Sequence, residues 1–152
     1  MKLAEALSNR SDLQKRINML NGRLRKSCTV KESSTPPEDV KELLKELDVC
    51  LKQFQKLVYR INVTNLSTTV EGRNLTEVMA ERDALQQRVK IYHDVVKTLM
   101  EGGQDRWSSE DKTIRLLDVP EFRKEMDAYS KQLRQLDLKL QQANWTIDLV
   151  EV

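Results

Sequence analysis

Apolar residues recur along this chain at alternating intervals of three and four, with charged residues between them. The longest such row runs through residues 118–150. A heptad sustained over this length keeps one narrow apolar face toward a partner helix. Its apolar members are Val119, Phe122, Met126, Tyr129, Leu133, Leu136, Leu140, Ala143, Ile147 and Val150.

Three further rows predict three more helices, over residues 3–26, 39–65 and from Asn74 to a stop at Gly102 and Gly103. Asp39 and Asn74 are the predicted N-caps, and Glu42 is expected to complete a capping box with Asp39. The rows are Leu3, Ala6, Arg10, Leu13, Ile17, Leu20 and Leu24; Val40, Leu43, Leu47, Cys50, Phe54, Leu57 and Ile61; and Leu75, Val78, Arg82, Leu85, Val89, Tyr92, Val96 and Leu99.

The connections between these rows lose the helical period. Residues 27–32 and 66–73 are predicted to form short strands, the second turning at Gly72. A third strand is expected at residues 113–117, at the end of a loop that begins at Gln104. Pro36 and Pro37 exclude a helix between the first two rows.

The sequence is internally duplicated. Residues 3–17 align with 75–89, and residues 39–67 align with 118–146 without a gap. This predicts a single domain, 1–152, built of two helix–strand–helix repeats, about 1–73 and 74–152. Because one helical hairpin cannot bury its own seam, the two copies should pack together. The predicted fold class is mainly α: antiparallel helical hairpins forming a long, coiled-coil-like four-helix bundle with short β ribbon segments at the connections.

The second helix carries an additional apolar stripe made of Leu44, Leu51 and Val58. The duplicated helix has Arg123, Ser130 and Asp137 at the equivalent positions. Either the second helix is more central in the core, or the stripe is a homo-oligomer interface. We favour the interface.

Two arginines, Arg10 and Arg82, occupy equivalent seam positions in the two repeats. A buried guanidinium needs a partner. We therefore expect each side chain either to pair with a carboxylate or helix-end carbonyl and fix the register, or to extend to solvent. A further alternative is that the two converge near the pseudo-two-fold axis and bind an anion such as phosphate.

Three residues near the repeat ends are interpreted as structural. Asn65 and Asn144 are expected at helix ends, and Trp145 is expected to anchor a core or an interface. His93 is the only histidine and has no second histidine or cysteine at metal-ligand spacing. It is interpreted as a surface residue.

Composition argues against an enzyme. Charged residues make up 33% of the chain and aromatics 5%, which is typical of long, solvent-exposed helices. No Ser/His/Asp grouping or glycine-rich phosphate loop is present. We therefore expect no catalytic residue, cofactor or metal.

Cellular location is inferred from cysteines and apolar runs. Cys28 and Cys50 have no paired spacing and are expected to be free thiols in a reducing cytoplasm. We expect neither a secretory signal nor a membrane span, because no apolar run approaches the roughly 20 residues needed.

The net charge is only +2, but cations concentrate near the beginning of the chain. A basic segment of this kind suggests a nucleic-acid surface or, more commonly, a solvated helix face. Without a recognition motif, nucleic acid and membrane are not expected as partners. The cations are Lys15, Arg16, Arg23, Arg25, Lys26 and Lys31.

Several segments carry a family resemblance: residues 1–17, 36–39, 60–65, 75–77, 82–85 and 141–145. On these segments the chain resembles a family of small bacterial proteins labelled septicolysin, built on a domain of unknown function. The resemblance implies a bacterial, mostly helical, coiled-coil-like protein without an established site, and its label implies a cytolysin.

The function predicted from these observations is that of a cytoplasmic, self-associating structural or interaction module. One alternative is a cytolysin or membrane-active protein, as the label implies. Another is an anion or nucleic-acid binder that uses Arg10, Arg82 and the basic first helix.

Overall fold

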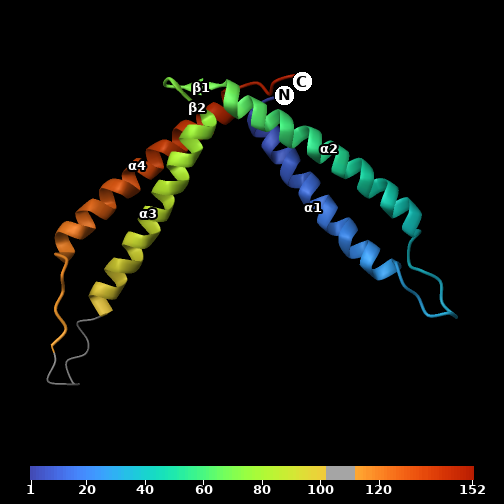
Figure 1. Ribbon diagram of the computed structural model, residues 1–152, viewed down its shortest axis with the longest axis horizontal. Helices are drawn as coiled ribbons and strands as arrows, with labels where there is room; N and C mark the ends of the chain where they lie inside the picture. The colour runs from blue at the N-terminus through green and yellow to red at the C-terminus, as the bar shows by residue number, and fades with distance from the viewer. Residues whose placement is uncertain (102–111) are drawn as a thin grey trace. The chain divides into compact units, whose positions relative to one another are not determined.

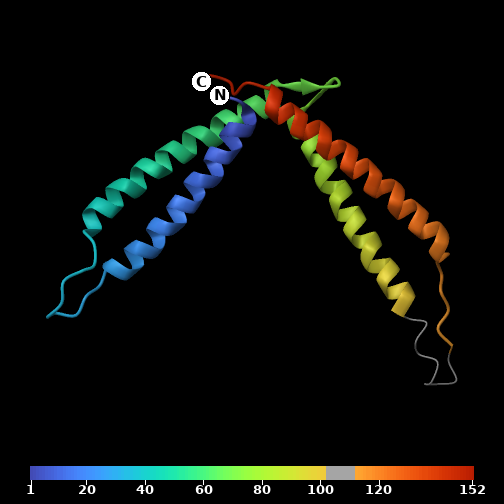
Figure 2. The same cartoon turned by 180° about the vertical axis from the view of Figure 1, so that it is seen from behind.

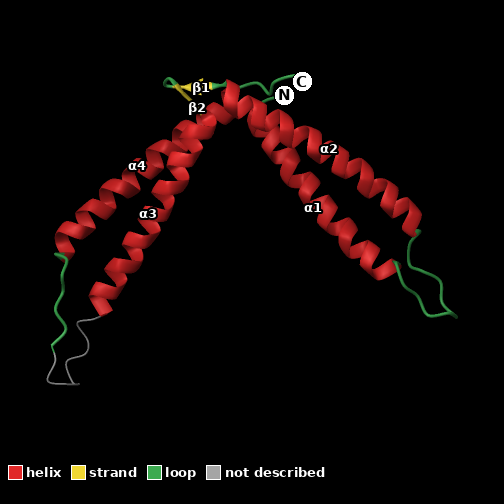
Figure 3. Ribbon diagram, viewed as in Figure 1, coloured by secondary structure: helices red, strands yellow, loops and turns green. Residues whose placement is uncertain are grey.

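The structure, a computed structural model, describes residues 1–101 and 112–152. In this part of the chain the helices are α1 (Leu3–Ser27), α2 (Val40–Ser67), α3 (Leu75–Glu101) and α4 (Val119–Thr146). The strands β1 (Thr69–Val70) and β2 (Arg73–Asn74) lie between α2 and α3 (Figure 1, Figure 3). The predicted bounds of α1 and α2 and the predicted starts of α3 and α4 are confirmed within one or two residues. The predicted helix stop at Gly102 and Gly103 and the start of the loop at Gln104 lie outside the described residues.

The chain divides into two compact units. The first contains Met1–Val70 together with Ala143–Val152, and the second contains Glu71–Gln142. The last ten residues, which include the last turn of α4, therefore belong to the same unit as the beginning of the chain. The single domain with repeats at 1–73 and 74–152 stays a prediction.

In the first unit, α1 and α2 pack side by side as an antiparallel hairpin (Figure 1, Figure 2). Leu20, Leu43 and Cys50 form a buried cluster between the two helices. Ile17, Leu24 and Leu47 pack against this cluster. These residues come from the two predicted seams, since a three–four spacing places all of them on the facing sides of their helices.

In the second unit, α3 and α4 form the other hairpin, and aromatic rings join them. Tyr92 of α3 stacks on Phe122 of α4 with a centroid distance of 4.5 Å, and Tyr129 approaches Tyr92 edge-on at 5.5 Å. Such ring pairs stabilise a contact beyond the apolar area that they bury. The predicted fold class, mainly α with antiparallel helical hairpins and a short β ribbon, is confirmed.

The predicted N-caps are observed, but the capping box is not. Asp39 Oδ1 accepts a hydrogen bond from the Lys41 backbone N–H at 2.9 Å, and Asn74 Oδ1 accepts one from the Glu77 N–H at 2.8 Å. Both bonds satisfy an N–H that the first helical turn leaves unpaired. Glu42 instead accepts from Lys45 Nζ at 3.1 Å, so its predicted role toward Asp39 is wrong.

The ribbon predicted at residues 66–73 is confirmed, as β1 and β2 pair in one two-stranded sheet. Its turn places Glu71 at φ 52° and Gly72 at φ 80°. Positive φ at both central residues is the geometry of a tight hairpin turn that matches strand twist. Glycine adopts this conformation without the clash that a Cβ introduces.

We expect Gly72→Ala to lower the free energy of unfolding by about 1 kcal/mol, because alanine is strained at this φ. The cost is one of backbone conformation, since no heavy atom lies within 4 Å of the added Cβ. Gly22→Ala is the matched control. A Cβ at Gly22, inside α1, also meets open space, and the change should stabilise by about 0.5–1 kcal/mol. Urea denaturation measures the change in the free energy of unfolding for both variants. A change of the same sign in the two variants would contradict a conformational cost at Gly72.

Two predicted strands are wrong. Residues 27–32 form the end of α1 and an irregular turn, and residues 113–117 are irregular and exposed. Their β-branched residues favour an extended backbone only weakly. A strand also needs a neighbour to pair with, and none lies beside these segments in the described part of the chain.

The helical row through Ile147 and Val150 is also wrong at its end. α4 ends at Thr146, and the following residues are extended: Lys2 and Asp148 form an antiparallel bridge. Leu149, which is outside the predicted row, is buried. The chain after Thr146 is extended rather than helical, because its backbone pairs with the first residues of the chain.

Candidate interaction site

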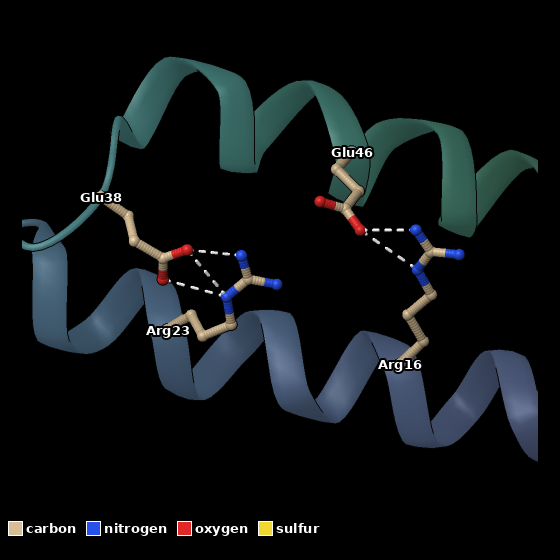
Figure 4. A network of polar contacts seen from close by, with 4 residues as sticks. All are labelled: Arg16, Arg23, Glu38 and Glu46. Atoms are coloured by element: carbon tan, nitrogen blue, oxygen red, sulfur yellow. Dashed lines mark hydrogen bonds and ion pairs between the residues drawn. The ribbon is translucent and has the colours of Figure 1, made fainter.

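Two arginine–glutamate pairs fix the first hairpin (Figure 4). Arg16 of α1 donates from Nε and Nη2 to Glu46 Oε1 of α2, at 3.1 and 2.7 Å. Arg23 of α1 donates from Nε to Glu38 Oε2 at 2.9 Å, just before α2 begins. A planar guanidinium fork restricts the geometry of its partner, so these pairs set how α2 lies along α1.

These pairs also shift the pKa values of Arg16, Arg23 and Glu38. The hydrogen bond to Glu46 raises the pKa of Arg16, and the bond to Glu38 raises the pKa of Arg23. In turn, the hydrogen bond from Arg23 lowers the pKa of Glu38 below its ordinary 4.5. All of these groups are therefore charged near neutral pH.

The lowered pKa of Glu38 predicts an acid-sensitive contribution to stability. The folded carboxyl binds its proton less readily than the unfolded one, so its contribution is present above the ordinary value of 4.5 and is lost as pH falls through the lower folded pKa. We expect Glu38→Gln to flatten the loss of urea resistance between about pH 5 and pH 3. Arg23→Gln, which removes the partner and keeps the carboxyl, should flatten it equally. A wild-type slope in either variant would refute the assignment.

The additional stripe of α2 is exposed. Leu44 is 50% and Leu51 is 45% exposed, while Val58 is half-buried. Their helix meanwhile contacts α1 through the buried Leu43 and Cys50. The stripe is thus a second apolar row outside the core of its own hairpin. Its role as an oligomer interface stays a prediction.

Arg82 and Arg10 differ, although they are equivalent in the duplication. Arg82 of α3 is half-buried; it donates from Nε to Asp83 at 2.8 Å and lies 3.5 Å from Asp137 of α4. Arg10 is exposed on α1. In α2 the position equivalent to Asp137 is Val58, which offers no charge. Arg82 therefore has the geometry of a link between α3 and α4, and anion binding by the two arginines stays a prediction.

The predicted helix-end residues lie in the last turns of α2 and α4. Asn65 is buried and Asn144 is half-buried. Trp145 is 70% exposed, so it does not lie in the core. Leu66, its equivalent in the first repeat, is 61% exposed. The structural role of these helix ends stays a prediction.

Residues 1–3, residues 147–151 and the end of α2 form a cluster that joins the two ends of the chain. We call this cluster the terminal clasp, and the sequence analysis did not predict it. The Leu3 N–H donates to the Ile147 carbonyl, and the Leu149 N–H to the Met1 carbonyl, both at 2.9 Å. Lys2 Nζ lies 2.9 Å from Asp148, which lowers the pKa of that carboxyl. No spacing in the sequence signals this pairing, because it joins opposite ends of the chain.

Thr64 and Arg60 of α2 complete the terminal clasp. The fully buried Thr64 hydroxyl donates to the Arg60 carbonyl at 2.8 Å and accepts from the Val150 N–H at 3.0 Å. Arg60 donates from Nε to the Val150 carbonyl at 3.0 Å and from Nη2 to Glu151 at 2.8 Å. These contacts hold the extended end of the chain against α2.

The cysteines and the histidine do not form a candidate site in the described part of the chain. Cys28 is exposed and Cys50 is buried, and both are free. His93 is exposed, and no group of side chains suited to a metal ion occurs among the described residues. In the same residues, no helix is both long enough and apolar enough to cross a bilayer.

Comparisons with known proteins give a family without an assigned activity. A family model described as a family of unknown function (DUF6847) matches residues 10–149. No curated protein matches. A crystal structure from Corynebacterium diphtheriae is 39% identical, with a TM-score of 0.90, and the match covers 99% of each chain. That protein is described as a functionally unknown conserved protein.

The resemblance to septicolysin-labelled proteins is therefore wrong, and the cytolysin alternative loses its basis. By its match over most of its length, the chain belongs to DUF6847, a family of unknown function.

Proposed function

We propose that this protein is a non-enzymatic interaction module that self-associates through the Leu44, Leu51 and Val58 stripe of α2. The observation that carries the proposal is the exposure of Leu44 and Leu51 on a helix whose other apolar face already contacts α1. Exposed apolar rows of this kind are commonly covered by a partner.

A second copy is the occupant that the stripe suits, through two-fold symmetry. A two-fold interface uses the same patch on both copies, so the patch must complement itself. In a parallel pairing of two α2 helices, the Asp48 and Lys52 side chains of the two copies would lie on opposite sides of the interface and would not meet. An antiparallel pairing centred near Leu51 places Asp48 close to the partner's Lys52. Opposite charges at such positions favour the antiparallel arrangement.

Within one chain Asp48 and Lys52 are 2.7 Å apart, so the two copies would bring two such pairs together. The alternating charges would flank the apolar contacts of the Leu51 side chains. Pairs at the rim of an interface contribute mainly to specificity and register. The apolar stripe would then supply affinity, and the charges would select the direction.

We expect Leu51→Glu to weaken self-association at least tenfold, because it places two carboxylates at the centre of the contact. Sedimentation equilibrium measures the change in mass, and far-UV circular dichroism checks that helix content is unchanged. Leu138→Glu is the matched control, as Leu138 is 60% exposed on α4 and outside the stripe. A wild-type chain that stays monomeric at high concentration would refute the proposal, as would an unchanged mass for Leu51→Glu.

The nucleic-acid alternative receives little support from the first helix. Three of its cations, Lys15, Arg16 and Arg23, each lie within 4.0 Å of a carboxylate of their own chain. Cations that are already paired release fewer counterions on binding phosphate. We place the proposed function in the cytoplasm, which is supported by the two free cysteines.

A further inference from the structure

A groove of about 490 Å³ lies along one side of the α1–α2 hairpin, away from the residues of the α2 stripe. α1 lines it with positions 9, 12, 13 and 16, and α2 with positions 53, 56, 57 and 60. Both sets have the spacing of one helix face, so the groove follows the line where the two helices meet. Met1 also lines it.

The lining combines apolar and basic side chains. Leu13 and Leu57 are its aliphatic members from the two helices, and Arg16, Lys56 and Arg60 are its cations. Ligand sites in proteins commonly have this character: mostly apolar walls with a few polar groups that orient the ligand.

The three cations are not equivalent, because two of them have carboxylate partners. Arg16 is bound to Glu46, and Arg60, whose side chain is only 15% exposed, is bound to Glu151. Lys56 has no ion-pair partner in the described part of the chain. The one acid of the lining, Asp12, lies 3.6 Å from Lys15. The uncompensated charge of the groove is therefore the positive charge of Lys56.

The size of the groove limits what can occupy it. Seven residues separate its ends on each helix, which corresponds to about 10 Å along the axis. Its volume falls in the range of small-molecule sites, roughly 300–1,000 Å³. A partner helix would need a longer contact, so the dimensions favour a small ligand.

We infer that this groove binds a small amphipathic anion, with an aliphatic chain against Leu13 and Leu57 and a carboxylate at Lys56. Arg60 and Arg16 stay bound to their own carboxylates, so Lys56 is the cation of the lining that is left to meet the ligand. The inference does not depend on self-association through the α2 stripe.

The test is a titration of ¹⁵N-labelled full-length protein with hexanoate and octanoate, followed by amide chemical shifts. The shifts should concentrate on residues 9–16 and 53–60. Each methylene buried contributes a factor of about four, so octanoate should bind on the order of tenfold more tightly than hexanoate. Octanol, which has the chain without the charge, should bind more weakly than octanoate.

Lys56→Glu should weaken octanoate binding on the order of tenfold, because it reverses the charge that meets the carboxylate. Lys41→Glu is the matched control: the same charge change on an exposed position of α2 that does not line the groove, and it should leave binding unchanged. Equal weakening in both variants would mean that only the overall charge matters and would overturn the inference. So would an absence of binding, affinities independent of chain length, or shifts centred on Leu44 and Leu51.

Discussion

Leu20→Ala should lower the free energy of unfolding of the first hairpin by about 2–5 kcal/mol. Leu20 is 0% exposed and lies at the centre of the cluster with Leu43 and Cys50. Truncation removes buried methyl groups and leaves a cavity that two long helices cannot close by a small shift. Domains of this size are stable by only about 5–15 kcal/mol, so this loss is a large fraction of the total.

The measurement needs to separate the two compact units, since they need not unfold together. Urea denaturation gives the overall change, and amide hydrogen exchange locates it. Exchange should accelerate in α1 and α2 more than in α3. Leu138→Ala, the same change at a 60% exposed position, should cost less than about 0.5 kcal/mol. Similar losses in the two variants would show that the cluster does not hold the first hairpin together.

The periodicity of apolar residues was sufficient to predict the helices and their facing sides. Leu20, Leu43, Leu75 and Leu136 are buried where the three–four spacing places them. This works because burying one face of a long helix leaves a repeating signal in the sequence. Caps such as Asn74 add a local signal, since their hydrogen bonds reach only two or three residues along the chain.

The spacing of apolar residues could not predict which of the two seam arginines has a carboxylate partner on the facing helix. Arg10 and Arg82 have the same place in the repeat, yet only Arg82 lies near a carboxylate of the facing helix. The difference depends on Asp137 of α4, which is Val58 in α2. A long arginine side chain without such a partner extends to solvent, where its charge is hydrated. The environment of a seam arginine is therefore decided by the other helix.

The terminal clasp was beyond sequence reasoning for a similar reason. Ile147 and Val150 continue the helical spacing of α4, and nothing local opposes a longer helix. The competing structure is tertiary: the backbone of residues 147–150 pairs with residues 1–3 and with Thr64. Such bonds satisfy backbone groups of the extended residues that follow α4, and they depend on residues far away in the sequence.

The importance of the terminal clasp can be measured with Thr64→Val, which we expect to cost about 1–3 kcal/mol. Valine keeps the shape of threonine but removes the hydroxyl. The Arg60 carbonyl loses a donor at 2.8 Å, and the Val150 N–H loses its acceptor at 3.0 Å. Because Thr64 is 0% exposed, water cannot replace the hydroxyl without moving the chain. Leaving a donor unpaired costs more than one hydrogen bond contributes.

Thr98→Val provides the control for this substitution. The Thr98 hydroxyl also donates to a carbonyl four residues earlier, at 3.1 Å, but its side chain is exposed. Its loss should change stability by no more than about 0.5 kcal/mol. If the terminal clasp opens before the helices unfold, the urea midpoint will move little, while exchange of the Val150 amide will accelerate strongly in Thr64→Val. Wild-type exchange at Val150 together with an unchanged midpoint would mean that the hydroxyl does not hold the end of the chain, and that Arg60 alone keeps it against α2.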